Sequence, residues 1–412
     1  MRPLLVFVAG KDPLEEPGGG HSVYVRACAR AAVRAGYAPQ ILCVGATARV
    51  RETDFGTIRR LRSPFRPLRQ LMIPGHAPIL ARGLVTLAAA RPGPVLAHGF
   101  GVWGAAAVDG CARLRRRGRT AVAVIGSYTT YRVESDSLVR GLRDAPVRVA
   151  LGYRAQAAWA RAVVHRYERA AYRGAARVFV NYESVRRLVL AEHGPTVRVE
   201  RVAYGPESAF LPPPEPGAVP AEIAVLRPAG APLVVSVARS HSRKGVDVLV
   251  DALALARDRG TPLRACLIGE GPLLADNRRR ARALGLDGAV VLAGRVAEVE
   301  PYLRRADVFA LASREEQSGA LALLEALRAG LPIAASAVDG IPEDVRDGES
   351  ALLVPPGDAP ALASALVRLA ADAALRRRLA AGAAAVYATR FAAEPFAASL
   401  GAAYAALGFP PS

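Results

Sequence analysis

Short apolar runs alternate with amphipathic, Ala-rich stretches along the whole chain. In the first half, PLLVFVAG, QILCVGA, PVLAHGF and TAVAVIG are too short for helices and apolar enough for buried strands of a parallel sheet. RVFVNYES and VRVERVAYGP have the pattern of two further strands, and the stretch from Ser22 to Ala35 has that of a helix. This alternation predicts a doubly wound α/β domain.

A second series of strands and helices begins at Leu233, with the apolar runs VVSVA, LIGEG, VVLAG, VFALAS and PIAAS. Between the two series lies LPPPEPGAVPAEIAVLRPAGAP, whose proline content disfavours the interior of any element. We therefore predict two similar domains, residues 1–210 and 233–382, joined by a linker over residues 211–232. The Ala-rich tail, residues 383–412, is predicted to be helical and to pack back on the first domain. A chain of 412 residues is also expected to form two hydrophobic cores.

The chain is strongly basic, with a formal net charge of +19. Such a charge is typical of proteins that meet nucleic acid, an anionic membrane surface or anionic substrates. The arginines, however, are spread over the whole chain together with abundant Ala, Gly and Pro, as a general bias in composition would also produce. We therefore expect no nucleic-acid partner.

The cysteines and the apolar segments bear on the compartment. Cys28, Cys43, Cys111 and Cys266 show no CxxC and no metal-ligand spacing, and they lie in apolar surroundings, so buried free thiols of a reducing compartment are expected. The apolar run near the start is too short for a signal sequence, and no segment reaches about 18 uninterrupted apolar residues. The expected location is the cytoplasm.

One predicted helix, from Leu151 to Arg173, is basic along one side. At about 100° per residue, one arc carries arginines and the other carries apolar and aromatic residues. The arc of arginines comprises Arg154, Arg161, Arg166, Arg169 and Arg173, and the opposite side comprises Trp159, Val163, Val164 and Tyr167. A basic amphipathic helix can lie on an anionic bilayer, here at the inner face of the membrane. The alternative is an ordinary surface helix packed on its own domain.

The segment SVARSHSRKG carries two cations that stand out. Lysine occurs only at Lys11 and Lys244, while the other 53 of the 55 basic residues are arginines. Arg239 and Lys244 lie five residues apart on a loop that enters a helix, where free backbone N–H groups and the helix dipole favour an anion. A phosphate there would gain charge-assisted hydrogen bonds of about 1.5 to 3 kcal/mol each. The alternative is a pair of solvated surface cations.

Glu325 lies within ALALLEAL, which is otherwise apolar. A carboxylate is rare in such a run unless it has a partner. The two neighbouring hydroxyl groups of a ribose would serve, because an ionised carboxylate accepts hydrogen bonds. The alternative is a glutamate on the helix surface. Because ligands of open α/β sheets bind beyond the carboxyl ends of the strands, the loops after VVSVA, LIGEG and VFALAS are expected to converge on one site.

With these motifs, the chain from about residue 233 to 365 resembles family 4 of the retaining glycosyltransferases. The resemblance implies the GT-B fold, in which two Rossmann-like, doubly wound parallel-sheet α/β domains face each other across a cleft. It also implies that the first domain binds the acceptor and the second binds the sugar nucleotide. Arg239 and Lys244 would then grip the diphosphate, and Glu325 would bind the ribose.

The resemblance implies further contacts. It assigns catalytic roles to Arg239, Lys244, Glu316 and His98. His98 lies in LAHGF and matches a histidine that family members often carry after their fourth strand. Residues 316–321 would reach the transferred sugar, the turns at residues 269–271 and 294–296 would border the nucleotide, and the glycine-rich loop of residues 18–20 would approach the phosphates. The implied donor contacts are Gly19, Gly20, Gly269, Gly271, Arg295, Val296, Gln317, Ser318, Gly319, Ala320, Leu321 and Glu325.

Three positions depart from the family pattern. In one of them, the Asn-Gly often seen before the linker is replaced by Tyr204-Gly205-Pro206. Family members place two glutamates eight residues apart. In this chain the residue eight positions before Glu325 is Gln317, and a glutamate, Glu316, lies directly before Gln317. Either the acid has moved by one position, or an amide contacts the sugar. A second histidine is common after the fifth strand, where this chain has Ser127 and Tyr128.

No Asp-x-Asp is present to hold a divalent metal between phosphates, so no metal and no other cofactor is expected. Fixed cations and backbone N–H groups would stabilise the leaving diphosphate instead. By resemblance, a hexosyltransferase-like reaction retains the anomeric configuration, and the departing phosphate oxygen helps to deprotonate the acceptor. The expected partners are a UDP- or GDP-sugar donor and a carbohydrate, lipid-linked or small-molecule acceptor. The alternatives are a catalytically silent GT-B partner subunit and a GT-B sugar-nucleotide epimerase.

Overall fold

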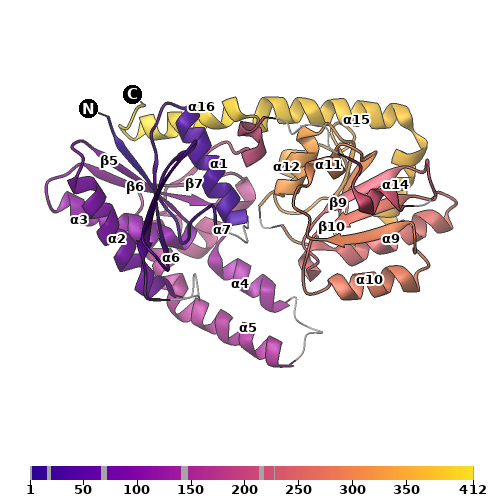
Figure 1. Ribbon diagram of the computed structural model, residues 1–412, viewed down its shortest axis with the longest axis horizontal. Coiled ribbons are helices and arrows are strands. Elements are labelled where there is room, and N and C mark those ends of the chain that lie inside the picture. Colours follow the sequence, from indigo (N-terminus) through magenta and orange to yellow (C-terminus); the bar gives the residue numbers. More distant parts are fainter. Residues whose placement is uncertain are drawn as a thin grey trace. The chain divides into compact units, whose positions relative to one another are not determined.

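The computed structural model describes residues 2–15, 20–65, 72–140, 147–212, 218–226, 228–316 and 318–411 (Figure 1). Gly18, Gly19 and Gln317, which the sequence singled out, lie outside these residues. The chain forms two compact units, Met1–Leu211 with Phe391–Ser412, and Pro212–Arg390.

The first unit is built on an eight-stranded sheet of order β3-β4-β2-β1-β5-β6-β7-β8. Its strands are β1 (Leu4–Val8), β2 (Gln40–Gly45), β3 (Arg49–Thr53), β4 (Gly56–Arg62), β5 (Val95–Phe100), β6 (Ala121–Ser127), β7 (Arg177–Val180) and β8 (Val199–Arg201). All neighbours are parallel except β3 and β4. The six strands predicted from the apolar runs are confirmed. The β3–β4 hairpin was not predicted, because it lies at the sheet edge, where charged side chains reach solvent.

Helices cover both faces of this sheet, because successive strand side chains point to opposite sides. They are α1 (Gly20–Arg34), α2 (Ile73–Ala89), α3 (Gly104–Arg115), α4 (Tyr131–Arg140), α5 (Val147–Trp159), α6 (His165–Gly174), α7 (Glu183–His193) and α16 (Ala393–Ala406). Leu4, Val6 and Val8 pack in one core with α2 and α3. On the other face Phe7 contacts His98, and α1 packs against α16, so the end of the chain closes the first unit (Figure 1).

The predicted basic helix is divided into α5, a π-helical turn (Ala160–Val164) and α6. Val164, Ala171 and Tyr172 are buried, and α6 packs on α3, so this part is a surface helix of its own domain. The five predicted arginines are all exposed. Trp159, the residue before the π turn, is 44% exposed.

The second unit has an all-parallel sheet of order β11-β10-β9-β12-β13-β14. Its strands are β9 (Leu233–Val237), β10 (Arg264–Ile268), β11 (Val290–Gly294), β12 (Val308–Leu311), β13 (Ile333–Ser336) and β14 (Leu352–Val354). Its helices are α8 (Ala221–Ala224), α9 (Val246–Asp258), α10 (Leu274–Ala283), α11 (Glu300–Leu303), α12 (Leu321–Arg328), α13 (Ile341–Asp344), α14 (Ala359–Ala371) and α15 (Ala373–Val386). Apolar side chains of α9 and α14 form a core with alternate residues of the strands.

Part of the predicted linker folds onto the second unit. The Glu222 carboxylate accepts a hydrogen bond of 2.8 Å from the Tyr302 hydroxyl, and Leu226 is buried. At the other end of the unit, Asp358 and Asp372 begin α14 and α15 as N-caps, each accepting a backbone N–H at 2.8 Å. A π-helical turn, Tyr387–Phe391, then leads to α16 of the first unit.

The four cysteines are buried free thiols, as predicted. Burial raises the pKa of Cys111 and of Cys266 to about 12, and it raises those of Cys28 and Cys43 further. Among the described residues, no helix is both long enough and apolar enough to cross a bilayer.

Candidate functional site

The loops that follow β9, β10 and β12 meet at the carboxyl edge of the second sheet, as predicted. β9 lies between β10 and β12, so these loops are neighbours. The Ser240 N–H donates to the Glu270 carbonyl at 3.0 Å, which joins the first loop to the second. The Arg314 and Glu315 N–H groups donate to the Arg243 carbonyl at 2.8 and 3.0 Å, which joins the first loop to the third.

Glycines allow these backbones to approach so closely. Gly245 has φ of 60°, and a Cβ there would lie 1.9 Å from the Ala312 carbonyl oxygen. Gly269 has φ of 140°, and a Cβ there would lie 2.1 Å from the Ala238 carbonyl oxygen. Gly271 would meet Ser240 in the same way. Side chains are therefore excluded from the junction of the three loops.

Lys244 is held by an acid of the third loop. Its Nζ, on a side chain 14% exposed, contacts Glu316, which also accepts from the Ser313 hydroxyl. The Glu316 N–H donates to the Asp339 carboxylate at 2.6 Å. Burial lowers the pKa of Lys244, while the charge of Glu316 opposes that shift. The structure thus brings together Lys244 and Glu316, two of the residues predicted to be catalytic.

More cations surround this pair than the sequence prediction named. Arg239 is exposed, and its charge, with those of Arg243 and Lys244, acts on His241. Burial first, and then these three cations, lower the pKa of His241, so the neutral imidazole is favoured. A concentration of positive charge beside a strand end is suited to an anion.

The N-terminus of α9 is already occupied by an acid. Asp247 accepts the N–H groups of its own residue and of Val248, and it makes two hydrogen bonds of 2.8 and 2.6 Å with Arg314. Although burial opposes the shift, these bonds hold the pKa of Asp247 below its usual value. An anion at this loop would therefore depend on side-chain cations more than on the helix terminus that the sequence suggested.

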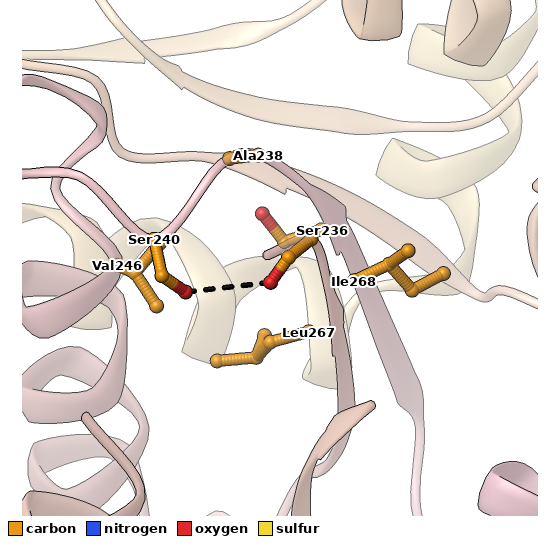
Figure 2. Close-up of a pocket in the computed structure, with 7 residues that line it drawn as sticks. Ser236, Ala238, Ser240, Val246, Leu267 and Ile268 are labelled. Carbon is orange, nitrogen blue, oxygen red and sulfur yellow. Dashed lines mark hydrogen bonds between the residues drawn. The ribbon is translucent and has the colours of Figure 1, made fainter. Parts of the chain in front are cut away.

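A small pocket lies beneath the first two loops (Figure 2). It is lined by Ser236, Ala238, Ser240, Val246, Leu267, Ile268 and Gly269. The Ser240 hydroxyl donates to the Gly269 carbonyl at 3.5 Å across this pocket. Its lining combines apolar side chains with the hydroxyl groups of Ser236 and Ser240.

The predicted contacts at the turns lie on the same edge. The Gly269 N–H donates to the Gly294 carbonyl at 2.7 Å, so the turn that carries Arg295 and Val296 adjoins the second loop. Arg295 is exposed, and Val296 is partly buried. Ser318, Gly319 and Ala320 lead into α12, which begins at Leu321.

Glu325 lies in the second turn of α12 and is partly buried. Burial, and to a lesser extent Glu300, raises its pKa to about 7, and Arg328 opposes the shift. The described part of the chain offers its carboxylate no hydrogen-bond partner. A group that donates hydrogen bonds to this carboxylate would lower its pKa.

His98 lies inside the first unit. It is 1% exposed, its Nδ1 is 2.6 Å from the Tyr404 hydroxyl, and its ring stacks on Phe100. Burial lowers its pKa to about 3. The His98 side chain is thus enclosed in the core of the first unit, and its catalytic role stays a prediction.

The loops of the first sheet place other polar groups at its carboxyl edge. Gly20 begins α1, and His21 follows it with Nδ1 3.2 Å from the Tyr128 hydroxyl after β6. Ser127 instead accepts a hydrogen bond of 2.7 Å from the Tyr172 hydroxyl and is buried. Of the two residues predicted for this place, Ser127 is buried and Tyr128 is partly exposed.

Sequence reasoning missed Asp339, which binds the backbone of Glu316. It is the one non-glycine residue with a positive φ, of 50°, among the residues that the structure describes. A strained residue in a loop is a sign of function. The dipeptide Asp-Gly in VDGIPE was the available signal, since it marks a tight turn after a buried strand.

Two parallel-sheet α/β domains, the second with a cationic site beyond its strand ends, define a glycosyltransferase of the GT-B class. Residues 231–372 match the family described as glycosyl transferases group 1, and residues 19–205 match the glycosyl transferase 4-like domain. The chain belongs to this group 1, or family 4, of glycosyltransferases.

Curated relatives agree with this assignment. A 36% identical stretch of 153 residues, 37% of this chain and 44% of the relative, is shared with the lipopolysaccharide core biosynthesis glycosyltransferase LpsE of Rhizobium meliloti. A D-inositol 3-phosphate glycosyltransferase of Nocardioides sp. is 28% identical over 90% of this chain and 83% of its own. The LpsE match covers less than half of that protein's length.

Solved structures show the same fold. Sucrose-phosphate synthase of Thermosynechococcus elongatus superposes with a TM-score of 0.73 at 22% identity, over 99% of each chain. Anabaena HepE in complex with UDP superposes with a TM-score of 0.68 at 17% identity, over 98% of this chain and 100% of that one. These likenesses are evidence of fold alone.

Proposed function

We propose that the protein is a retaining, metal-independent glycosyltransferase that moves a sugar from a nucleotide-diphosphate sugar to a hydroxyl acceptor. The observation that carries the proposal is the contact between Lys244 and Glu316 at the carboxyl edge of the second sheet. The mostly buried ammonium group of Lys244 and the carboxylate of Glu316 are close enough for one small ligand to contact both. The first would bind its negative charge, and the second would accept hydrogen bonds from its hydroxyl groups.

The cations would bind the donor diphosphate. Arg239 and Arg243 lie on the same loop as Lys244, and Arg239 is exposed and able to turn toward a ligand. As the glycosyl bond breaks, negative charge grows on the leaving phosphate oxygen, and a fixed cation stabilises it most when water is excluded. No protein carboxylate is assigned as a metal ligand at this step, because the cations neutralise the diphosphate.

Glu316 and Glu325 would bind the remaining parts of the donor. A diphosphate at Lys244 competes with Glu316 for the ammonium group, which frees the carboxylate to accept sugar hydroxyls. Glu325 would accept the two ribose hydroxyls. The anomeric configuration is retained if the acceptor hydroxyl attacks the sugar from the face that the diphosphate leaves. The departing phosphate oxygen then takes the proton of that hydroxyl.

The nucleotide and the acceptor remain classes rather than single compounds. HepE is solved with UDP, and a mannosyltransferase of Mycolicibacterium smegmatis, 34% identical over 149 residues, 34% of this chain and 39% of its own, is described as GDP-mannose-dependent. The names of the relatives include lipopolysaccharide, phosphatidylinositol and kanosaminyl products. The proposal therefore covers UDP- or GDP-sugars as donors and carbohydrate, lipid-linked or small-molecule acceptors.

The proposal includes peripheral binding to an anionic membrane through α5 and the start of α6. Arg154, Arg161 and Arg166 are exposed there. Leu151 and Trp159 are also exposed, by 58% and 44%. Exposed apolar and aromatic side chains among arginines are suited to the boundary between lipid headgroups and acyl chains.

A thermal-shift panel of UDP- and GDP-sugars identifies the donor, because a ligand of the native state raises its stability. With that donor, Lys244→Ala and Arg239→Ala should fold normally and lose transfer by about 100-fold or more. Arg279→Ala, which removes an exposed arginine of α10 in the same unit, is the matched control and should retain transfer.

The outcomes separate the alternatives. Transfer by both variants within about twofold of the parent would refute the proposed mechanism. Binding of a sugar nucleotide without transfer or hydrolysis would indicate a silent partner subunit, and an epimerised donor would indicate an epimerase. Loss of transfer in a chelator that Mg²⁺ or Mn²⁺ restores and Zn²⁺ does not would refute metal independence.

A further inference from the structure

Four ionisable side chains of α6 and α7 lie together in the first unit. His165 and Glu168 belong to α6, and Glu192 and His193 to the end of α7. One ligand atom from each of His165, Glu168 and Glu192 lies within 4.8 Å of the others. Glu168 is 1% exposed and His193 is 0% exposed, so both side chains are shielded from bulk solvent.

Several polar atoms in this cluster have no hydrogen-bond partner among the described residues. They are His165 Nδ1, Glu168 Oε2, Glu192 Oε2 and both ring nitrogens of His193. The other oxygen of Glu168 accepts the Tyr131 N–H at 2.7 Å, so the carboxylate is held in place. Buried polar atoms are nearly always paired, and a group of such atoms at one point calls for a ligand between them.

The distances match a shared metal ion better than hydrogen bonds. His165 Nδ1 lies 3.5 Å from Glu168 Oε2, and His193 Nε2 lies 3.8 Å from the same oxygen. Both separations are long for a hydrogen bond. Two ligands of a tetrahedral zinc ion, each about 2.0 to 2.1 Å from the metal, lie about 3.4 Å apart. The cluster therefore needs only small side-chain movements to enclose such an ion.

We propose that His165, Glu168 and Glu192 bind one divalent transition-metal ion of the Zn²⁺ class, with the fourth position facing His193. An imidazole with carboxylates is a donor set for Zn²⁺, whereas Mg²⁺ and Ca²⁺ prefer oxygen ligands alone. The ion is structural and separate from the proposed transfer chemistry. The partly exposed His165, at 14%, gives it a route of entry.

Charges around the cluster act in both directions. Glu168 and Glu192 together neutralise a doubly charged cation, and without one they repel each other. Arg132 lies near Glu192, and Arg169 and Arg173 lie near His193, so these arginines oppose the ion. The Arg169 guanidinium donates to His165 Nε2 at 3.2 Å and must turn into solvent when Nδ1 binds a metal.

A bound ion would fix the loop between β6 and α4. Glu168 holds the N–H of Tyr131, the first residue of α4. Tyr172, one turn further along α6, donates to Ser127 at the end of β6 and stacks on His193. Ser127 and Tyr131 flank the loop that carries Tyr128, and each is hydrogen-bonded to a residue of α6. By fixing α6, the ion would therefore also fix both ends of this loop.

The test uses the full chain without a polyhistidine tag. After treatment with a chelator and removal of the chelator, the parent should take up one equivalent of Zn²⁺, measured by elemental mass spectrometry, and its melting temperature should rise. Mg²⁺ should have no such effect. Glu192→Gln and His165→Gln should each weaken Zn²⁺ binding by at least about tenfold.

Glu183→Gln, at the partly exposed first residue of the same helix α7, is the matched control and should bind Zn²⁺ like the parent. The melting temperatures of the chelator-treated variants show that they are folded. Substoichiometric uptake by the parent, or uptake that neither Glu192→Gln nor His165→Gln changes, would overturn the proposal. Transfer activity plays no part in this readout, so it is independent of the donor site.

Discussion

Replacing Glu325 by Gln should change how stability depends on pH. The residue has a pKa of about 7 in the folded chain against 4.5 for an ordinary glutamate, because burial disfavours the charged form. Its contribution to stability is therefore fully present below about pH 4.5 and is lost as the pH rises through about 7. The substitution keeps the shape of the side chain and removes the charge.

The magnitude follows from the shift. A rise from 4.5 to about 7 corresponds to at most about 3 kcal/mol at high pH, and since water reaches part of the side chain we expect about 1 to 2 kcal/mol. The Gln variant should thus be more stable than the parent by this amount near pH 8 and nearly equal to it near pH 5. Histidines with lowered pKa values, such as His241, affect both proteins alike, so the difference isolates position 325.

Scanning calorimetry is the suitable assay, because both tryptophans, Trp103 and Trp159, lie in the first unit and do not report on the second. A difference between variant and parent that is constant from about pH 5 to about pH 8 would refute the reasoning.

Nucleotide binding gives a second readout of the same residue. Ribose hydroxyls donate to the ionised carboxylate, so the affinity for UDP or GDP should rise more steeply with pH through about 7 in the parent than in Glu325→Gln, because the terminal phosphate of the ligand titrates alike with both proteins. Titration calorimetry in buffers of different ionisation enthalpy should show greater proton release for the parent than for the variant. Equal proton release by both would remove Glu325 from the ribose site.

Two further predictions concern other parts of the chain. Gly245→Ala should destabilise the second unit by about 3 kcal/mol or more, because Gly245 has a positive φ and a Cβ there would collide with the Ala312 carbonyl. Gly260→Ala is the control and should destabilise the unit by about 1 kcal/mol, because Gly260 also has a positive φ but a Cβ there would meet open space. Equal calorimetric costs would show that the close approach is not the cause. Arg154→Glu combined with Arg161→Glu should weaken sedimentation with anionic vesicles by about tenfold or more and leave neutral vesicles unaffected, whereas unchanged binding would contradict the membrane proposal.

The sequence predicted the fold well where apolar runs are continuous. Except for β14, which is three residues long and was not predicted, the buried parallel strands of both sheets came from such runs, because strands covered on both faces need apolar side chains throughout. The β3–β4 hairpin escaped prediction because its edge position leaves its charged residues in solvent. The π turn at Ala160–Val164 also escaped, since hydrophobic periodicity assumes a constant helical pitch.

The sequence identified several residues of the candidate site, but it did not show which of them contact each other. Lys244 and its loop were identified because lysine is rare in this chain and because a glycine follows Lys244. The contact with Glu316 could not be read from spacing, since it depends on how loops 72 residues apart in the chain meet. For His98, a motif match could not show that the side chain is enclosed by aromatic rings of the sheet and of α16, and its catalytic role stays a prediction.

The inert thiols make this chain a convenient host for site-directed spectroscopy. All four native sulfhydryls are enclosed and hard to ionise, so maleimide and nitroxide reagents should pass them by. A new cysteine on an outward-facing position of each lobe could then carry a dye or spin label without prior removal of the natural ones. Donor addition could be followed as a change in label separation, in otherwise unaltered enzyme.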